Sequence, residues 1–123
     1  MTTYTIDKDG NSIETSKATS KPSDRHFRNA WTLSGTVISE DMPTAKTMFK
    51  NKIREIRKPL LEAQDVLYMK AIEDGDSSAQ STVATKKKEL RDAPAASAIT
   101  NATTITELKA AWNTSLLGAS PYA

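Results

Sequence analysis

The middle of the chain carries a long stripe of apolar residues at helical spacing. Between residues 45 and 71 successive members lie three or four residues apart, which places their side chains on one face of an α-helix. The stripe stays in phase across Pro59, so it predicts one long helix kinked near that residue or two helices that meet there. Asp41 is a candidate N-cap, and Pro43 suits the first helical turn. The eight positions are Ala45, Phe49, Ile53, Ile56, Leu60, Ala63, Leu67 and Ala71.

A polar turn and a second helical segment follow the stripe. Gly75 is expected just beyond the end of the first helix, with Asp76 or Ser77 as the N-cap of the next. A weaker stripe over about residues 78–91 predicts a second helix that folds back on the first in an αα-hairpin. Its members are Ala79, Val83, Lys87 and Leu90.

The first forty residues favour short strands. Residues 4–6 and 12–15 flank the turn-forming string Asp-Lys-Asp-Gly-Asn, and residues 28–33 and 36–39 flank the pair Ser34-Gly35. Each arrangement is typical of a β-hairpin. Because an isolated hairpin is at best marginally stable, these strands need a larger sheet or a helix to pack on.

The last third is expected to hold a short helix and an irregular tail. An alanine-rich block around Pro94 ends the second helix. The segment from Thr104 to Glu107 then matches the capping-box pattern of Ser or Thr, two residues and Glu, ahead of Leu108 and Trp112. No helical periodicity follows Gly118.

Together these segments predict an α+β fold in three parts. N-terminal short β-hairpins occupy residues 1–40, a long helical hairpin residues 41–92, and a short C-terminal helix with a tail residues 93–123. Of the 46 apolar residues 16 are alanine, which leaves 30 larger side chains for a core. That number is small, because each buried side chain of this size contributes only about 1.5–3 kcal/mol against roughly 1–2 kcal/mol of backbone entropy per ordered residue. The fold is therefore expected to be extended or to be completed by partners.

Composition excludes several classes of site. The chain has no cysteine, which rules out a disulfide framework, a thiolate nucleophile and cysteine-ligated metal sites. A net charge of +2 is too small for a general nucleic-acid footprint. The longest apolar runs are too short to span a bilayer and the N-terminus lacks an apolar signal-peptide region, so we expect no membrane span and synthesis in the cytoplasm.

Candidate chemistry is sparse. His26 is the only histidine, and without cysteine it offers too few ligands for a zinc site. Asp7, Asp9 and Asn11 resemble the start of a calcium loop, but the glycine and glutamate that such a loop needs later are missing, so a hairpin turn is the better interpretation. We find no recognisable nucleophile motif, phosphate loop or paired-carboxylate pocket. The sequence therefore predicts a protein that is not an enzyme and that has no catalytic, cofactor-binding or metal-binding residues.

Two groups of residues suit binding instead. Residues 46–58 carry six basic side chains and one acidic one, a local charge of +5 that could bind an acidic partner or phosphates, although a solvated helix face is the more common role. Four large aromatic residues serve either the small core or contacts with a partner, and the core is the expected role for at least two of them. They are Phe27, Trp31, Phe49 and Trp112.

The stretch from Ser23 to Pro94 resembles a family of small phage proteins found among tail genes, especially in marine phages. The resemblance lies in DRHFRNAWTLSGTVISED, IREIRKPLLEAQDVLYMKAIEDGD and TKKKELRDAP. The helical part is also similar to the phage tail assembly chaperone family, whose pattern has a basic residue, Arg-x-x-Leu-Leu-x-x-x-Asp, a polar turn and a final Leu-Arg-Asp-x-Pro. The matching positions are Arg54, Arg57, Leu60, Leu61, Asp65, Leu90, Arg91, Asp92 and Pro94.

The resemblance implies a non-enzymatic protein of the virion tail, made in the host cytoplasm, that binds other phage tail or tail-fibre proteins. Because association would relieve the small core, we also expect a homo-oligomer in the assembly, threefold around a fibre or matching the symmetry of the tail. One alternative is an assembly chaperone that the virion does not retain, and a second is a basic-helix module that binds DNA or an anionic surface, although nucleic acid is not the expected partner.

Ten residues are candidates for binding a partner or for fixing the helical hairpin. Among these residues, we expect Arg91 to pair with Asp65 across the hairpin and so to fix the register of the two helices. Pro94, just beyond them, is expected to stop the second helix. The ten are Phe27, Arg28, Trp31, Arg57, Leu61, Asp65, Leu90, Arg91, Asp92 and Trp112.

Overall fold

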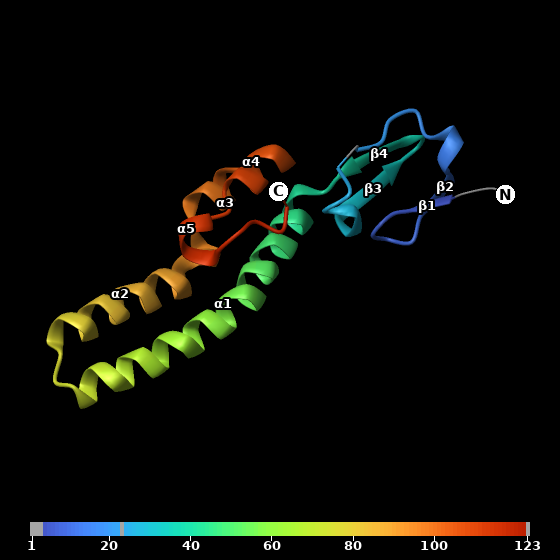
Figure 1. The fold of residues 1–123 in the computed structure, drawn as a ribbon. Helices are drawn as coiled ribbons and strands as arrows, with labels where there is room; N and C mark the ends of the chain where they lie inside the picture. Colours follow the sequence, from blue (N-terminus) through green and yellow to red (C-terminus); the bar gives the residue numbers. More distant parts are fainter. Residues whose placement is uncertain (1–3, 23, 123) are drawn as a thin grey trace.

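The protein is elongated, with its strands at one end and a helical hairpin reaching toward the other (Figure 1). The computed structural model describes residues 4–22 and 24–122. Two small antiparallel strand pairs are followed by a long helix, a second helix folded back on it and short C-terminal helices. The predicted α+β class and order of elements are confirmed.

The first hairpin forms at the predicted place. Strand β1 (Tyr4–Ile6) pairs with β2 (Ser12–Glu14), and Thr5 lies opposite Ile13. The second hairpin pairs β3 (Trp31–Ser34) with β4 (Val37–Glu40).

The loop of the second hairpin differs from the prediction by one residue. Ser34 pairs with Val37, so the two loop residues are Gly35 and Thr36 rather than Ser34 and Gly35. Gly35 has a φ of +64° at the first loop position, a conformation that glycine adopts readily and serine does not. The preceding segment Arg28–Ala30, predicted as strand, is a single 3₁₀ turn.

The carboxylate of Asp7 holds the two hairpins together. It accepts hydrogen bonds from the backbone N–H groups of Asn11 (2.8 Å) and Asp9 (3.0 Å) within its own turn, and from that of Leu33 (2.8 Å) in β3. The N–H of Leu33, more than any other group, lowers the pKa of Asp7. The structure thus confirms the predicted hairpin turn.

Helix α1 (Met42–Glu73) runs without interruption through Pro59, which decides between the two predicted alternatives in favour of one helix. Figure 1 shows that it curves along its length. Asp41 is the N-cap, as predicted, and its side chain accepts a hydrogen bond from the N–H of Thr44 at 3.1 Å.

Helix α2 (Ser77–Asp92) folds back along α1 and completes the predicted helical hairpin. Gly75 lies in the turn with a φ of +64°, which suits the left-handed position just after a helix. Asp76 caps α2 by accepting a hydrogen bond from the N–H of Ala79 at 3.0 Å.

The C-terminal third contains more helix than predicted. Where one short helix was expected, the structure has a 3₁₀ turn (Ala93–Ala95), α3 (Ser97–Asn101), α4 (Ile105–Ala110) and α5 (Thr114–Leu117). Helix α4 is the predicted one, and its N-cap Thr104 accepts a hydrogen bond from the N–H of Glu107. Helices α3 and α5 are only four or five residues long, too short to show a period in the sequence.

Four aromatic rings form the centre of the core, and each comes from a different part of the chain. Phe49 of α1 lies 5.5 Å from Tyr122 and 5.7 Å from Trp112 between ring centroids, and Phe27 stacks on Tyr122 at 4.9 Å. Trp112 also donates a hydrogen bond from Nε1 to the carbonyl of Gly118 at 3.1 Å. The C-terminal tail, which has no helical periodicity, is therefore packed into the core.

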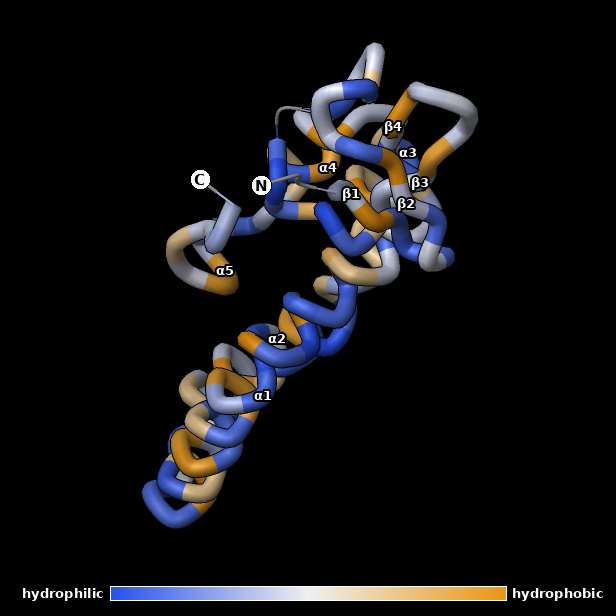
Figure 2. Tube along the Cα trace, turned by 90° about the vertical axis from the view of Figure 1, so that its right-hand side faces the viewer, coloured by the Kyte–Doolittle hydropathy of each residue, from blue (hydrophilic) through white to orange (hydrophobic). Residues whose placement is uncertain are grey.

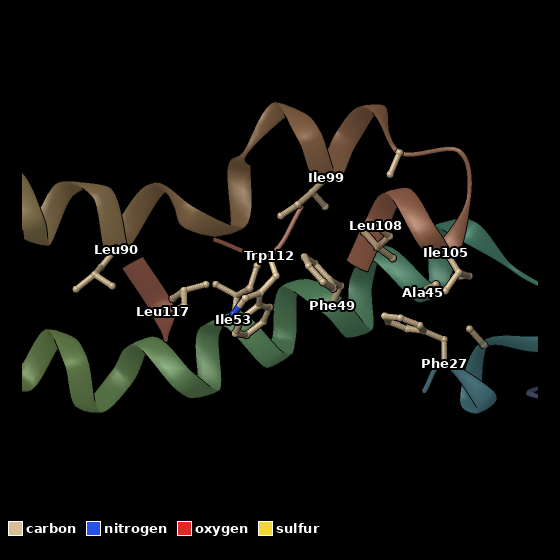
Figure 3. Packing of buried hydrophobic residues seen from close by; sticks show 12 residues of the cluster. Phe27, Ala45, Phe49, Ile53, Leu90, Ile99, Ile105, Leu108, Trp112 and Leu117 are labelled. Carbon is tan, nitrogen blue, oxygen red and sulfur yellow. The ribbon is translucent and has the colours of Figure 1, made fainter. Parts of the chain in front are cut away.

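Further apolar side chains extend this core along the first half of α1 (Figure 3). They come from α1, the end of α2 and the three short helices, so the C-terminal third covers the beginning of the long helix. The buried members besides the aromatic rings include Ala45, Ile53, Leu90, Ile99, Ile105, Leu108 and Leu117.

We predict that Phe49→Ala lowers the free energy of unfolding by about 3–5 kcal/mol, because it removes a fully buried ring from the centre of this core. The matched control is Leu67→Ala, which changes another position of the same predicted stripe that is exposed. Its cost should stay below about 1 kcal/mol. Urea denaturation of both variants measures this, and equal losses would contradict the packing described.

We predict that Asp7→Asn lowers the melting temperature by several degrees at pH 7 and by progressively less as the pH falls below about 4. The folded-state pKa of Asp7 lies below its unfolded value, so its carboxylate adds stability above the unfolded pKa and loses that contribution as the pH falls through the folded pKa. Thermal unfolding at pH 7 and pH 3 checks this, with Asp9→Asn as the control. A deficit of the same size at both pH values would contradict the role given to Asp7.

Candidate functional site

The second half of the predicted stripe is not buried. Ala63 and Leu67 were expected to face the core, but both are exposed, and only Ala71 is buried near the end of α1. The reason is that α2 begins with Ser-Ser-Ala-Gln-Ser-Thr, whose side chains other than that of Gln80 are small and cover only a narrow strip of α1. Gln80 reaches across to donate a hydrogen bond to the carbonyl of Ala71 at 3.3 Å.

Four large apolar side chains of this half of α1 remain in solvent on more than one side of the helix, and we call them together the distal apolar face. Met69 lies two residues, or about 200° around the helix, from the buried Ala71, so it points away from α2. Figure 2 shows apolar residues among hydrophilic ones along this end of the helical hairpin. The face consists of Val66 (55% exposed), Leu67 (45%), Met69 (61%) and Ile72 (50%).

A second exposed apolar surface lies on β1, at the end of the molecule away from the hairpin turn (Figure 1). Tyr4 is 59% and Ile6 is 58% exposed, and we call this pair the β1 apolar pair. The residue between them, Thr5, points inward and lies 2.9 Å from the hydroxyl of Thr15. The usual order is thus inverted, with the apolar side chains outside and the polar one inside.

The predicted pair between Arg91 and Asp65 is wrong. Asp65 Oδ1 instead lies 2.6 Å from Lys87 Nζ, which also sits 5.6 Å from the ring centroid of Tyr68. In a helical hairpin, residues at similar distances from the turn face each other, and Arg91 is one helical turn too far along α2 to meet Asp65.

Arg57 fixes the hairpin at the level of Arg91. Its Nη1 donates hydrogen bonds to the carbonyls of Leu90 (3.3 Å) and Arg91 (2.8 Å), the last turn of α2, where a cation is favourable. Leu90 is fully buried, and Leu61 packs at the border of the core. Asp92 pairs with Lys88 along α2, and this contact lowers the pKa of Asp92.

The predicted aromatic contact residues lie in the interior. Phe27, Trp31 and Trp112 are all buried, so their side chains support the fold and offer no exposed surface to a partner. Arg28 is exposed in the 3₁₀ turn beside them.

Several of the basic side chains in residues 46–58 of α1 form contacts within the molecule. Lys46 Nζ donates to the carbonyl of Thr100 near the end of α3 at 2.8 Å, and Arg57 binds the end of α2. Lys52 pairs with Glu55 at 3.5 Å, and Arg54 donates to the side chain of Asn51. Two of these cations therefore bind helix ends, a role that the sequence pattern did not indicate.

A charged cluster joins the strand end of the molecule to α4. Asp24 Oδ2 pairs with Lys109 Nζ at 2.5 Å, and Asp24 Oδ1 lies 2.9 Å from His26 Nδ1. The hydrogen bond from Lys109 lowers the pKa of Asp24, whereas burial and the nearby Asp24 charge raise the pKa of Glu40. No local sequence pattern indicates this cluster, because Asp24 and Lys109 are 85 residues apart.

A cleft of about 330 Å³ lies between the end of α2 and α5. Apolar side chains, among them Ile53, Leu116 and Leu117, form part of its wall, and Lys88 and Glu89 lie at its polar side. Its size and mixed lining suit an apolar side chain of another protein.

The described part of the chain contains neither a candidate metal cluster nor a candidate membrane span. Residues 4–22 and 24–122 contain no group of three or more histidine, cysteine, aspartate or glutamate side chains placed to hold a metal ion. Within the same ranges no helix has the length and apolar character needed to cross a membrane. Comparisons with protein-family models, curated proteins and solved structures found no match to this chain.

We predict that Asp65 is energetically coupled to Lys87 and not to Arg91. A double-mutant cycle of Asp65→Ala and Lys87→Ala should give a coupling of about 0.2–1 kcal/mol, the usual range for a partly exposed ion pair. The matched cycle of Asp65→Ala and Arg91→Ala should be additive. Urea denaturation of the single and double variants measures both, and coupling to Arg91 alone would contradict the observed register.

Proposed function

We propose that this chain is a non-enzymatic bacteriophage tail protein that binds other tail or tail-fibre components as a structural part of the virion. The observation that carries the proposal is the presence of two exposed apolar surfaces, the distal apolar face and the β1 apolar pair, at separate ends of an elongated molecule. Several large apolar side chains left exposed in one part of a small protein commonly mark sites of interaction with other proteins.

Each surface has a physical reason to bind. Covering apolar surface contributes about 25 cal/mol per Å² removed from water, and the large side chains of both surfaces are about half exposed. The β1 apolar pair lies on a sheet of only two strands, whose edges offer backbone groups to a further strand. One end therefore suits strand addition and the other suits packing against a helix.

The tail assignment rests on the sequence resemblance over residues 23–94, and the distribution of the core agrees with it. The buried side chains are concentrated around the first half of α1, while the strand end and the hairpin end keep apolar residues in solvent. Such a distribution suits a part that neighbours in an assembly cover on two sides.

The test is mass spectrometry of purified particles of the phage that encodes this chain, together with deletion of its gene. A structural part should be present at a fixed ratio to the other tail proteins, and its loss should prevent functional tails. Absence from particles combined with failed tail assembly would instead support the assembly chaperone. Absence from particles combined with normal tails would contradict both.

We further predict that the double substitution Tyr4→Ser and Ile6→Ser lowers incorporation into particles at least tenfold. The change removes both side chains of the β1 apolar pair, which are exposed, and so should leave the core intact. The control is Lys17→Ser, an exposed charged position that is also in the N-terminal part of the chain. Quantitative mass spectrometry of complemented particles measures the effect, and equal incorporation of both variants would contradict the role of this surface.

A further inference from the structure

Charged residues on the outer side of α1 are arranged symmetrically about Val66. Glu62 lies four residues before Val66 and Lys70 four residues after it, so opposite charges stand at equal distances. Lys58 and Asp74 repeat the relation at eight residues, again with opposite signs. All four side chains are exposed, and none forms an ion pair with any other described residue.

The apolar residues of this face follow the same symmetry. Ala63 lies three residues before Val66 and Met69 three residues after it, and both are exposed. Offsets of three, four and eight residues keep side chains within about 80° of Val66 around the helix. These residues therefore form one continuous strip, which we call the Val66 strip: Lys58, Glu62, Ala63, Val66, Met69, Lys70 and Asp74.

We propose that the Val66 strip binds the same strip of a second copy of this chain, with the two helices antiparallel and a twofold axis passing beside Val66. Around such an axis a residue a given number of positions before Val66 lies level with the residue the same number of positions after it in the partner. Glu62 and Lys70 lie only about 40° to either side of Val66, so they meet twice, with the two Val66 side chains in contact at the centre. The pairs Ala63 with Met69 and Lys58 with Asp74 lie level on opposite flanks of the contact, about 60° and 80° from Val66. A parallel pair would instead oppose like charges at each of these positions.

The shape of the molecule leaves room for this arrangement. Helix α2 occupies the opposite side of α1, where Ala71 is buried and Asp65 pairs with Lys87. The strands and the short C-terminal helices gather at one end (Figure 1), so an antiparallel pair keeps the two bodies at opposite ends.

The contact is small. The strip spans 17 residues, or roughly 25 Å of helix at 1.5 Å per residue. One helix face of this length buries less surface than a standard stable interface, so the dimer should dissociate on dilution. The proposal replaces the threefold association expected from the sequence with a twofold one at this face. It does not depend on the tail assignment.

The first test is a charge swap followed by sedimentation velocity over a range of concentrations at low salt. The wild-type chain should dimerise, and Glu62→Lys or Lys70→Glu alone should weaken dimerisation about tenfold, because each opposes like charges twice. The double variant E62K/K70E should recover the wild-type affinity. A chain that stays monomeric up to about 1 mM, or a double variant weaker than both single variants, would overturn the proposal.

The second test uses the absence of cysteine from the chain. Under a mild oxidant Val66→Cys should give disulfide-linked dimers, and Glu62→Cys should crosslink with added Lys70→Cys protein but not with itself, because only facing positions come near disulfide distance. Ala84→Cys, an exposed position on α2, is the control. Self-crosslinking of Glu62→Cys, or no more crosslinking at Val66 than at Ala84, would overturn the antiparallel arrangement. Circular dichroism confirms that each variant is folded.

Discussion

The packing of three aromatic rings around Phe49 is the interaction on which the rest of the structure depends. Phe27 precedes the strand pair β3–β4, Trp112 links two short helices, and Tyr122 stands at the end of the tail, so the cluster joins the N-terminal and C-terminal parts on one helix. The Lys109 to Asp24 ion pair adds a second link between the same parts. Because the larger side chains are used here, few remain to cover the rest of α1.

The long helix is therefore divided into two halves with different roles. The first half is surrounded by the core, and the second is supported only by α2, whose small residues leave apolar side chains such as Met69 in solvent. Exposed apolar surface is unfavourable in an isolated chain and becomes an advantage once another protein covers it. The same reasoning applies to Tyr4 and Ile6 on β1, and both surfaces lie away from the cluster that stabilises the fold.

Periodicity and capping residues predicted the helical hairpin well, because these signals are local. Asp41, Asp76 and Thr104 cap helices at the expected places. The same signals did not predict that Leu67 is exposed, because a stripe identifies one face of a helix but not what covers it. They also missed the position of Tyr122 and the Lys109 to Asp24 contact, which depend on segments far apart in the sequence. In the sequence, the only sign of the exposed face is that the apolar stripe of the first helix is longer than the weaker stripe of the second helix.

We expect the apolar side chains at the two ends of the molecule to be exposed in the isolated chain and covered in its assembly. Hydroxyl-radical footprinting of the dilute protein and of purified particles measures this directly. Met69 and Tyr4 should react rapidly in the dilute protein and at least several times more slowly in the assembly, whereas the buried Trp112 should react slowly in both. Equal reactivity of Met69 and Tyr4 in the two states would contradict the account.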